Sequence, residues 1–207
     1  VLHGWNDLRY GEVDTPSIGP EEVLCRVSAC GICMTDVHIV KGNFKGVFPP
    51  QFPFILGHEW FGKIAALGSR VDGFSLGQRV VGEPQKGCGV CPRCKEGRYH
   101  LCLYASQPDK GYKLYGHTAN GAYAEYVAVH GTTIHPMPDH LGVEEGVSAC
   151  NVGIGLEAVR RARIDVGDTV AVIGVGLLGL IILQLAKVAG AVRTMAVGRG
   201  YRLKVAG

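Results

Sequence analysis

Hydrophobic and polar residues alternate along several short segments in the first two-thirds of the chain. In the segment VLCRVSAC, residues 23–30, every second residue is apolar. A two-residue period is typical of a β-strand that buries one face. Similar patterns predict strands over 61–68, 78–82 and 121–129, with glycine and proline in the segments between them. Residues 1–148 are therefore expected to form a β-rich domain.

The pattern changes after residue 148. The segment TVAVIG, 169–174, is a continuous apolar run that fits a strand buried on both faces, and LLGLIILQLAKVAG, 177–190, has the length of a helix. A second strand is predicted over 192–197. Residues 149–207 are therefore expected to begin a parallel α/β sheet, which makes the fold class α/β with a β-rich N-terminal domain.

The long apolar stretch in this second part does not predict a membrane span. Three glycines divide it after a strand-length run, and Gln184 and Lys187 interrupt the remainder. A transmembrane helix needs about 20 predominantly apolar residues in succession. We therefore expect no membrane partner.

Composition and charge narrow the function classes further. The chain has 207 residues, of which 47% are hydrophobic, and a net charge of +3 with its basic residues scattered. Such a charge pattern does not indicate a nucleic-acid partner. The first residues lack the features of a secretion signal, so a cytoplasmic location is expected and clustered cysteines favour metal or redox chemistry over disulfides.

A glycine-rich motif joins the predicted strand 169–174 to the predicted helix. The sequence GVGLLG contains three glycines with two leucines between them: Gly174, Gly176, Leu177, Leu178 and Gly179. In a dinucleotide-binding motif, the glycines permit a tight turn, an approach of backbone to pyrophosphate and close helix–strand packing. The strand and helix on either side favour this interpretation. The alternative is that the glycines serve close packing alone.

A cysteine-rich lobe is expected around residues 86–104. It holds four cysteines with the spacing C-x2-C-x2-C-x7-C: Cys88, Cys91, Cys94 and Cys102. Four thiolates form a closed tetrahedral shell around zinc, which is typical of a structural site. An iron–sulfur cluster is the alternative. In ferredoxin-type runs, however, the fourth spacing is shorter and a proline follows the last cysteine, whereas Leu103 follows Cys102 here.

A second set of residues has the composition of a reactive metal site. The segments CGICMTDVH and GHEW supply a thiol, two imidazoles, two carboxylates and a hydroxyl: Cys33, Thr35, Asp36, His38, His58 and Glu59. A catalytic zinc takes three protein ligands, keeps an exchangeable position, and has a carboxylate that orients its histidine. The alternative for a single cysteine or histidine is a place in the core.

These motifs, in this order, resemble the zinc-dependent medium-chain dehydrogenase/reductase family of alcohol, polyol and threonine dehydrogenases. The resemblance rests on GICMTDVH, GHEW, the four-cysteine lobe and GVGLLG, and it extends over the whole chain. It implies a GroES-like catalytic domain over 1–148, followed over 149–207 by the first part of a Rossmann doubly wound parallel sheet. Because a dinucleotide site in this fold uses two β-α-β halves, the chain is expected to be a C-terminally truncated piece.

The resemblance also implies roles for individual residues. Cys33 and His58 match catalytic zinc ligands, and Glu59 matches a glutamate that binds the metal in some members and lies just behind it in others. Cys150 falls where members place the remaining ligand.

A further group of residues matches the proton path of the family. Thr35 matches the hydroxyl that contacts the substrate oxygen, and His38 matches the histidine that ends a proton relay. Asp36 matches the carboxylate that orients the ligand histidine.

The end of the predicted strand 192–197 bears on the choice of nicotinamide cofactor. In NAD-binding proteins of this fold, an acidic residue there binds the ribose 2′-hydroxyl. This chain has Gly198 at that place, followed by Arg199, whose guanidinium can pair with a 2′-phosphate. NADP is therefore expected over NAD. The alternative is that Arg199 is a solvated surface residue and that other residues bind the ribose.

Together, the residues and the resemblance predict an oxidoreductase. It would use two zinc ions per chain and a nicotinamide cofactor to transfer a hydride to or from a small alcohol, polyol or carbonyl compound, as a homodimer or homotetramer when full length. The alternatives are a non-catalytic zinc-stabilised relative, an inactive fragment of the enzyme, and an electron carrier built on the cysteine lobe. Phe44, Phe48 and Trp60 are either pocket or core residues, and the substrate is not identified.

Overall fold

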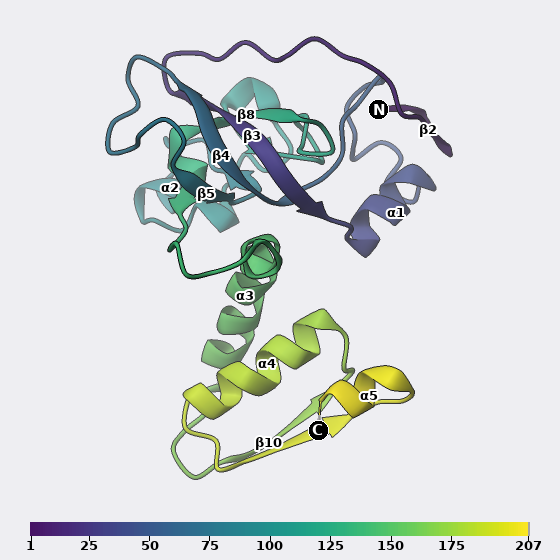
Figure 1. Cartoon of the computed structure of the whole chain (residues 1–207), viewed down its shortest axis with the longest axis vertical. Coiled ribbons are helices and arrows are strands. Elements are labelled where there is room, and N and C mark those ends of the chain that lie inside the picture. The colour runs from purple at the N-terminus through teal and green to yellow at the C-terminus, as the bar shows by residue number, and fades with distance from the viewer. Residues whose placement is uncertain (207) are drawn as a thin grey trace. The chain divides into compact units, whose positions relative to one another are not determined.

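The chain folds into two compact units, Val1–Ser148 and a second that begins at Ala149. The computed structural model describes residues 1–206 (Figure 1). Gly207, which ends the expected second domain, lies outside the described residues.

The first unit is built on a five-stranded antiparallel sheet with the strand order β8-β3-β4-β5-β9. The strands are β3 (Glu22–Gly31), β4 (Glu59–Leu67), β5 (Arg79–Gly82), β8 (Tyr126–His130) and β9 (Ile134–Pro136). The strands predicted over 23–30, 61–68 and 78–82 are confirmed. The alternating apolar residues bury one face of the sheet, and its core includes Val23, Cys25, Trp60, Val80 and Val127.

The strand predicted over 121–129 is shorter than expected, because β8 begins only at Tyr126. The preceding residues pair with a different segment. The N–H groups of Gly121, Ala122 and Tyr123 donate to the carbonyls of Ile55, Gly57 and Leu56 at 2.7–2.9 Å. This irregular pairing lies directly before His58 and holds the segment 121–123 against it.

Smaller elements surround this sheet. A hairpin of β1 (Leu2–Gly4) and β2 (Asp7–Leu8) begins the chain, and α1 (Met34–Val40) follows β3. The cysteine lobe contains α2 (Pro92–Lys95) and the 3₁₀-helices η1 (Tyr99–Leu101) and η2 (Pro108–Lys110), between the paired strands β6 (Gln85–Lys86) and β7 (Lys113–Leu114). The 3₁₀-helix η3 (Gly131–Thr133) joins β8 to β9.

The second unit contains a β-α-β arrangement. Strands β10 (Thr169–Ile173) and β11 (Arg193–Val197) pair in parallel, and α4 (Leu177–Val188) connects them (Figure 1). The elements predicted over 169–174, 177–190 and 192–197 are thus confirmed to within two residues. The short helix α5 (Tyr201–Val205) follows. This is the beginning of the expected parallel sheet.

A long helix that the sequence patterns do not predict, α3 (Val143–Ala162), runs across the boundary between the units. Three glycines within it weaken any helical signal. Gly155 has a packing role: a β-carbon there would lie 2.8 Å from Ile181 of α4, so the missing side chain allows α3 and α4 to approach.

None of the helices formed by residues 1–206 combines the length and apolar character needed to cross a lipid bilayer.

Candidate active site

The start of α1 places a thiol beside a hydroxyl. Cys33 directly precedes the helix, and its main-chain N–H donates a hydrogen bond of 2.9 Å to the carboxylate of Asp36. This bond satisfies one of the N–H groups that a helix start leaves without a partner. The Thr35 hydroxyl lies 3.6 Å from the Cys33 sulfur. His38 follows Thr35 by three residues, so the two lie on the same side of α1, and His38 is exposed.

The pairing of two strands brings the second motif to the first. In the β3–β4 ladder, Glu59 lies opposite Gly31, two residues before Cys33, and His58 directly precedes β4. Three ligand atoms therefore lie within 4.8 Å of one another: the Cys33 sulfur, a ring nitrogen of His58 and a carboxylate oxygen of Glu59. His58 and Glu59 are buried, and Cys33 is half-buried. Antiparallel pairing thus joins residues that are 25 positions apart in the sequence.

Asp36 orients the His58 ring. One carboxylate oxygen lies 3.4 Å from His58 Nδ1, and His58 Nε2 lies 3.9 Å from the nearer oxygen of Glu59. Within residues 1–206, Asp36 Oδ1 and His58 Nδ1 are buried without another hydrogen-bond partner, so these two atoms face each other. A proton on Nδ1 leaves the Nε2 lone pair for a metal ion.

The hydroxyl of Tyr123 is a second support for Asp36. It donates to the other carboxylate oxygen at 2.8 Å. Burial alone would raise the pKa of Asp36, but the His58 ring and the donors from Cys33 and Tyr123 hold this pKa below its ordinary value. Burial and the neighbouring carboxylate raise the pKa of Tyr123, so its hydroxyl keeps its proton.

These donors fit a zinc ion with an exchangeable position. A thiolate, an imidazole nitrogen and a carboxylate are all zinc ligands, and catalytic zinc sites use three protein ligands. Cys150 does not belong to this compact cluster. It lies in α3 within the second unit, whose placement relative to the first unit is not determined, so its role as a ligand stays a prediction.

The structure adds one histidine that the sequence patterns did not single out. The ring of His117 lies 4.6 Å from the ring of His58, centroid to centroid, and 5.2 Å from that of Phe48. Burial, with a smaller contribution from His58, lowers the pKa of His117. Neither its spacing nor its neighbours in the sequence point to this position, because it depends on the irregular pairing of residues 121–123.

The three aromatic residues considered for a pocket have different places. Trp60 is 1% exposed and belongs to the core of the sheet. Phe44 and Phe48 are half-buried, and their ring centroids are 4.5 Å apart. Phe44 also meets the His38 ring edge-on at 6.4 Å. Phe44 and Phe48 therefore form a series of ring contacts between His38 and His117, whereas Trp60 belongs to the core.

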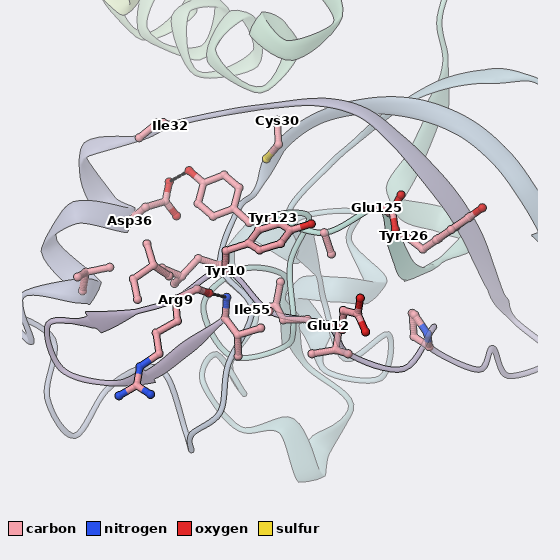
Figure 2. A pocket seen from close by; sticks show the side chains of 18 of the residues that line it. Arg9, Tyr10, Glu12, Cys30, Ile32, Asp36, Ile55, Tyr123, Glu125 and Tyr126 are labelled. Atoms are coloured by element: carbon pink, nitrogen blue, oxygen red, sulfur yellow. Dashed lines mark hydrogen bonds between the residues drawn. The ribbon is translucent and has the colours of Figure 1, made fainter.

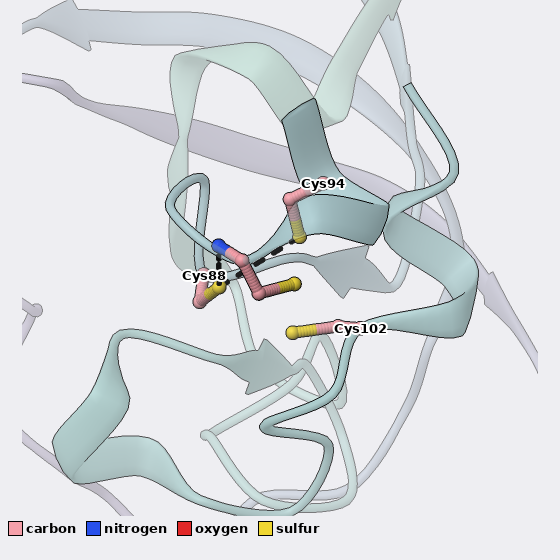
Figure 3. Close-up of side chains that lie close together, drawn as sticks. Cys88, Cys94 and Cys102 are labelled. Atoms are coloured by element: carbon pink, nitrogen blue, oxygen red, sulfur yellow. Dashed lines mark hydrogen bonds between the residues drawn. The ribbon is translucent and has the colours of Figure 1, made fainter. Parts of the chain in front are cut away.

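The four cysteines of the lobe form a second cluster. Their sulfur atoms all lie within 4.8 Å of one another, and Figure 3 shows those of Cys88, Cys94 and Cys102 pointing toward a common centre. The Cys88 and Cys94 sulfurs are 3.8 Å apart, which equals the roughly 3.8 Å edge of a tetrahedron with zinc–sulfur bonds of about 2.3 Å. The cysteines form no disulfides. This spacing suits a single ion at the centre.

Main-chain N–H donors lower the pKa of two of these thiols, Cys88 and Cys91. The N–H groups of Val90 and Cys91 lie 3.4 and 3.3 Å from the Cys88 sulfur, and they lower its pKa against the opposing effect of burial. A hydrogen bond from the Leu103 main chain is the main cause that lowers the pKa of Cys91 to about 6. Burial raises that of Cys94 to about 12. A bound cation would favour the thiolate form of these sulfurs.

The glycine loop has the geometry expected of a dinucleotide-binding turn. Gly174 has a φ of 101°, which suits glycine, and a β-carbon on Gly179 would lie 1.9 Å from the Gly174 carbonyl oxygen. Gly176 caps the N-terminus of α4, and Leu177 and Leu178 form its first turn. The first turn of α4 therefore follows the loop directly, which is the arrangement in which helix N–H groups can bind a phosphate.

The residues after β11 lie against this loop. A β-carbon on Gly198 would lie 2.4 Å from Val175 Cγ2, so a larger residue there would displace the loop. Arg199 is exposed. The sequence patterns missed Arg202, whose Nη1 lies 3.9 Å from where a Gly176 β-carbon would be. Its spacing of three residues from Arg199 is the signal that could have identified it.

A cavity of about 1050 Å³ in the first unit is bounded by the N-terminal segment, α1 and the segment around Tyr123. Figure 2 shows Asp36 and Tyr123 joined by their hydrogen bond at its wall, with Arg9, Tyr10 and Glu12 from the N-terminal segment. Of the metal cluster and its supports, only Asp36 and Tyr123 line it. The cavity therefore lies behind the cluster and does not include its ligand atoms.

Comparison with known proteins identifies the fold and relatives of the chain. Residues 19–139 match the family described as the alcohol dehydrogenase GroES-like domain. The chain is 38% identical over 191 residues to a sorbitol dehydrogenase of Bacillus subtilis, covering 92% of this chain and 52% of that protein. It is 33% identical to a D-arabitol-phosphate dehydrogenase of Enterococcus avium, covering 91% of this chain and 51% of that protein.

A solved structure agrees. A protein from Sinorhizobium meliloti 1021, described as a zinc-binding dehydrogenase and bound to NADP, matches 99% of this chain and 57% of its own chain, with a TM-score of 0.88 and 33% identity. The chain spans about half the length of the curated relatives it matches. On its folding units, its motifs and these matches, the chain belongs to the zinc-dependent medium-chain dehydrogenase/reductase family and carries its GroES-like domain followed by the start of a Rossmann fold.

Proposed function

We propose that the full-length protein is a zinc-dependent oxidoreductase that transfers a hydride between a polyol or other alcohol and a nicotinamide cofactor. The observation that carries the proposal is the cluster of Cys33, His58 and Glu59, whose ligand atoms lie within 4.8 Å of one another beside the Thr35 hydroxyl. The named activities of the relatives, sorbitol and D-arabitol-phosphate dehydrogenase, support a polyol as the substrate class.

Two zinc ions per chain are part of the proposal. Cys33, His58 and Glu59 would hold the catalytic ion, with Cys150 as a further ligand, and the four cysteines of the lobe would hold a structural one. The sulfur spacing in the lobe supports one ion over an iron–sulfur cluster, because the inorganic atoms of a cluster would hold the thiolates farther apart.

The chain's own residues would bind the alcohol and move its proton. Bound zinc supplies Lewis acidity that lowers the pKa of an alcohol, and the nicotinamide supplies the hydride acceptor. Thr35 Oγ1, beside the Cys33 sulfur, would accept the alcohol proton and pass its own toward His38, which delivers a proton to solvent from the exposed side of α1. Asp36 and Tyr123 would keep the His58 ring in place.

This proton path predicts unequal effects for its two members. Thr35→Ala is expected to lower kcat/KM for alcohol oxidation by about a hundredfold, because it removes the hydroxyl next to the reacting oxygen. His38→Gln is expected to cost less and to slow oxidation mainly at low pH, where deprotonation of the alcohol is hardest. Steady-state rates of both variants across a pH series test this; equally small losses at every pH would contradict the path.

We also propose that NADP is preferred over NAD. Gly198 offers no carboxylate to the ribose 2′-hydroxyl, and the guanidinium groups of Arg199 and Arg202 would pair with a 2′-phosphate. The position of Arg202 supports this pairing, because its guanidinium lies near the glycine loop and its helix follows the end of β11, where the ribose 2′ position is recognised in such folds.

Arginine substitutions test the cofactor preference. Arg199→Gln and Arg202→Gln are each expected to raise the KM for NADP by about tenfold and to leave the KM for NAD within about twofold. Gly198→Asp is a poor test, because its β-carbon would meet Val175 and disturb the binding of either cofactor. A wild-type protein that uses NAD better than NADP would contradict the assignment.

A substrate panel tests the overall proposal. Primary alcohols, secondary alcohols, polyols and L-threonine would be assayed with the full-length protein by nicotinamide absorbance, and turnover is expected with polyols. No turnover with any compound would favour a non-catalytic relative. Visible iron–sulfur absorbance would instead indicate an electron carrier.

A further inference from the structure

His117 is a buried histidine that the proposed reaction leaves without a role. Its side chain belongs to the first unit and is enclosed between the rings of His58 and Phe48. The residue is 7% exposed, although a polar ring at such a place must find partners for both nitrogens or meet a ligand. Its neighbour His58 belongs to the proposed metal cluster, so His117 lies next to that cluster.

The backbone fixes this position firmly. His117 lies in a tight turn, in which the N–H groups of His117 and Thr118 both donate to the Leu114 carbonyl at 3.0 and 2.8 Å. The same loop is attached to the residue before His58, because Ala122 donates to the Gly57 carbonyl at 2.9 Å. At Gly121, a β-carbon would lie 2.1 Å from the Gly57 oxygen. The two histidines are thus held together by main-chain contacts and do not depend on side-chain packing alone.

The two nitrogens of the ring have different surroundings. Nδ1 lies 3.2 Å from the Tyr115 carbonyl oxygen, which can only accept, so Nδ1 carries a proton and donates it to this bond. Nε2 makes no hydrogen bond within the described chain. Among residues 1–206, the fully buried side-chain polar atoms without a hydrogen-bond partner are Asp36 Oδ1, His58 Nδ1 and Asn151 Nδ2. His117 Nε2 is not one of them, so it is not fully buried. Nε2 is therefore neither fully buried nor hydrogen-bonded to the described chain, so it can accept a new partner.

We propose that His117 Nε2 binds a second hydroxyl of the substrate, on the carbon next to the one that is oxidised, and so selects polyols over simple alcohols. A hydroxyl both donates and accepts, so it can pair with Nε2 in either protonation state of the ring. The apolar ring of Phe48 packs against His117 and competes for no hydrogen bond. The inference rests on the proposed function and specifies the substrate class of that site.

A matched pair of substrates tests the inference. The full-length, zinc-loaded protein would be assayed with 2,3-butanediol and 2-butanol, which differ in one hydroxyl. His117→Phe keeps an aromatic ring and removes the nitrogen, and it is expected to lower kcat/KM for the diol by about tenfold and to leave that for 2-butanol within about threefold. His117→Gln places an amide near the Nε2 position and is expected to restore much of the preference.

Equal losses for both substrates in His117→Phe, at unchanged zinc content, would assign His117 a structural role and overturn the inference. A second readout does not need turnover. In the wild-type protein, the ¹⁵N chemical shift of His117 Nε2 is expected to move on addition of the diol and not on addition of 2-butanol. An unmoved shift at saturating diol would contradict the inference. A protein that turns over no compound of the substrate panel yet shows the shift would contradict the proposed function and retain the binding site.

Discussion

Replacement of Cys33 by alanine is expected to reduce the zinc content of the full-length protein from two ions to one and to lower kcat/KM for alcohol oxidation by about a thousandfold or more. The loss is large because the Cys33 sulfur is both a ligand in the cluster with His58 and Glu59 and the neighbour of the Thr35 hydroxyl. Zinc by atomic absorption and steady-state rates, measured on the same preparation, check the two effects together.

Cys30 provides a matched control for this experiment. It lies three residues earlier, at the end of β3, but is not a member of the cluster, and burial raises its pKa to about 12. It therefore remains a thiol, and Cys30→Ala is expected to keep both zinc ions and most of the activity. If Cys33→Ala behaved like Cys30→Ala, the catalytic assignment would be wrong.

Cys94→Ser is expected to release the other zinc ion and to lower the melting temperature by about 10 °C, as the loss of a few kcal/mol would in a protein of this size. The lobe has a small core. Its buried residues are Cys88, Cys91, Cys102 and Tyr112, so the cysteines make up most of its small core. Without a cation, the thiolates would repel one another.

Molecules of Cys94→Ser that remain folded are expected to keep the rate per catalytic zinc within about threefold, because a closed site has no position for substrate. Lys95→Ala, an exposed neighbour in α2, is the control for the lobe and is expected to leave zinc content and melting temperature unchanged. An unaltered melting temperature together with full zinc content in Cys94→Ser would refute the structural role.

The elements that could be predicted from the sequence are those whose pattern is local. Strand β3 is indicated by the alternation of apolar and polar residues, and strand β10 by a continuous apolar run. The spacing of glycines in GVGLLG indicates the turn that follows β10. Helix α3 could not be found in this way. Its glycines allow tertiary contacts, such as that of Gly155 with Ile181. Such contacts produce no periodic pattern of apolar residues in the sequence.

The same distinction applies to the candidate site. The candidate metal ligands lie within short motifs, and so do some of their hydrogen-bond partners, such as Asp36 for Cys33. These residues could therefore be predicted from the sequence. Tyr123 and His117 reach the site through the pairing of residues 121–123 with 55–57, which replaces the expected start of a strand. No pattern in the sequence specifies that replacement, so residues that depend on it could be identified only in the folded chain.

The most direct test of the central claim starts from full-length protein in which the Cys33 site has been emptied of zinc and the cysteine lobe keeps its ion. Zinc is then added back, and the rate of NADPH formation from a polyol is measured at each step. The account predicts that the rate rises in proportion to occupancy of the second site and reaches its maximum at two zinc ions per chain. A constant rate from one ion to two, or no polyol oxidation at full occupancy, would contradict it.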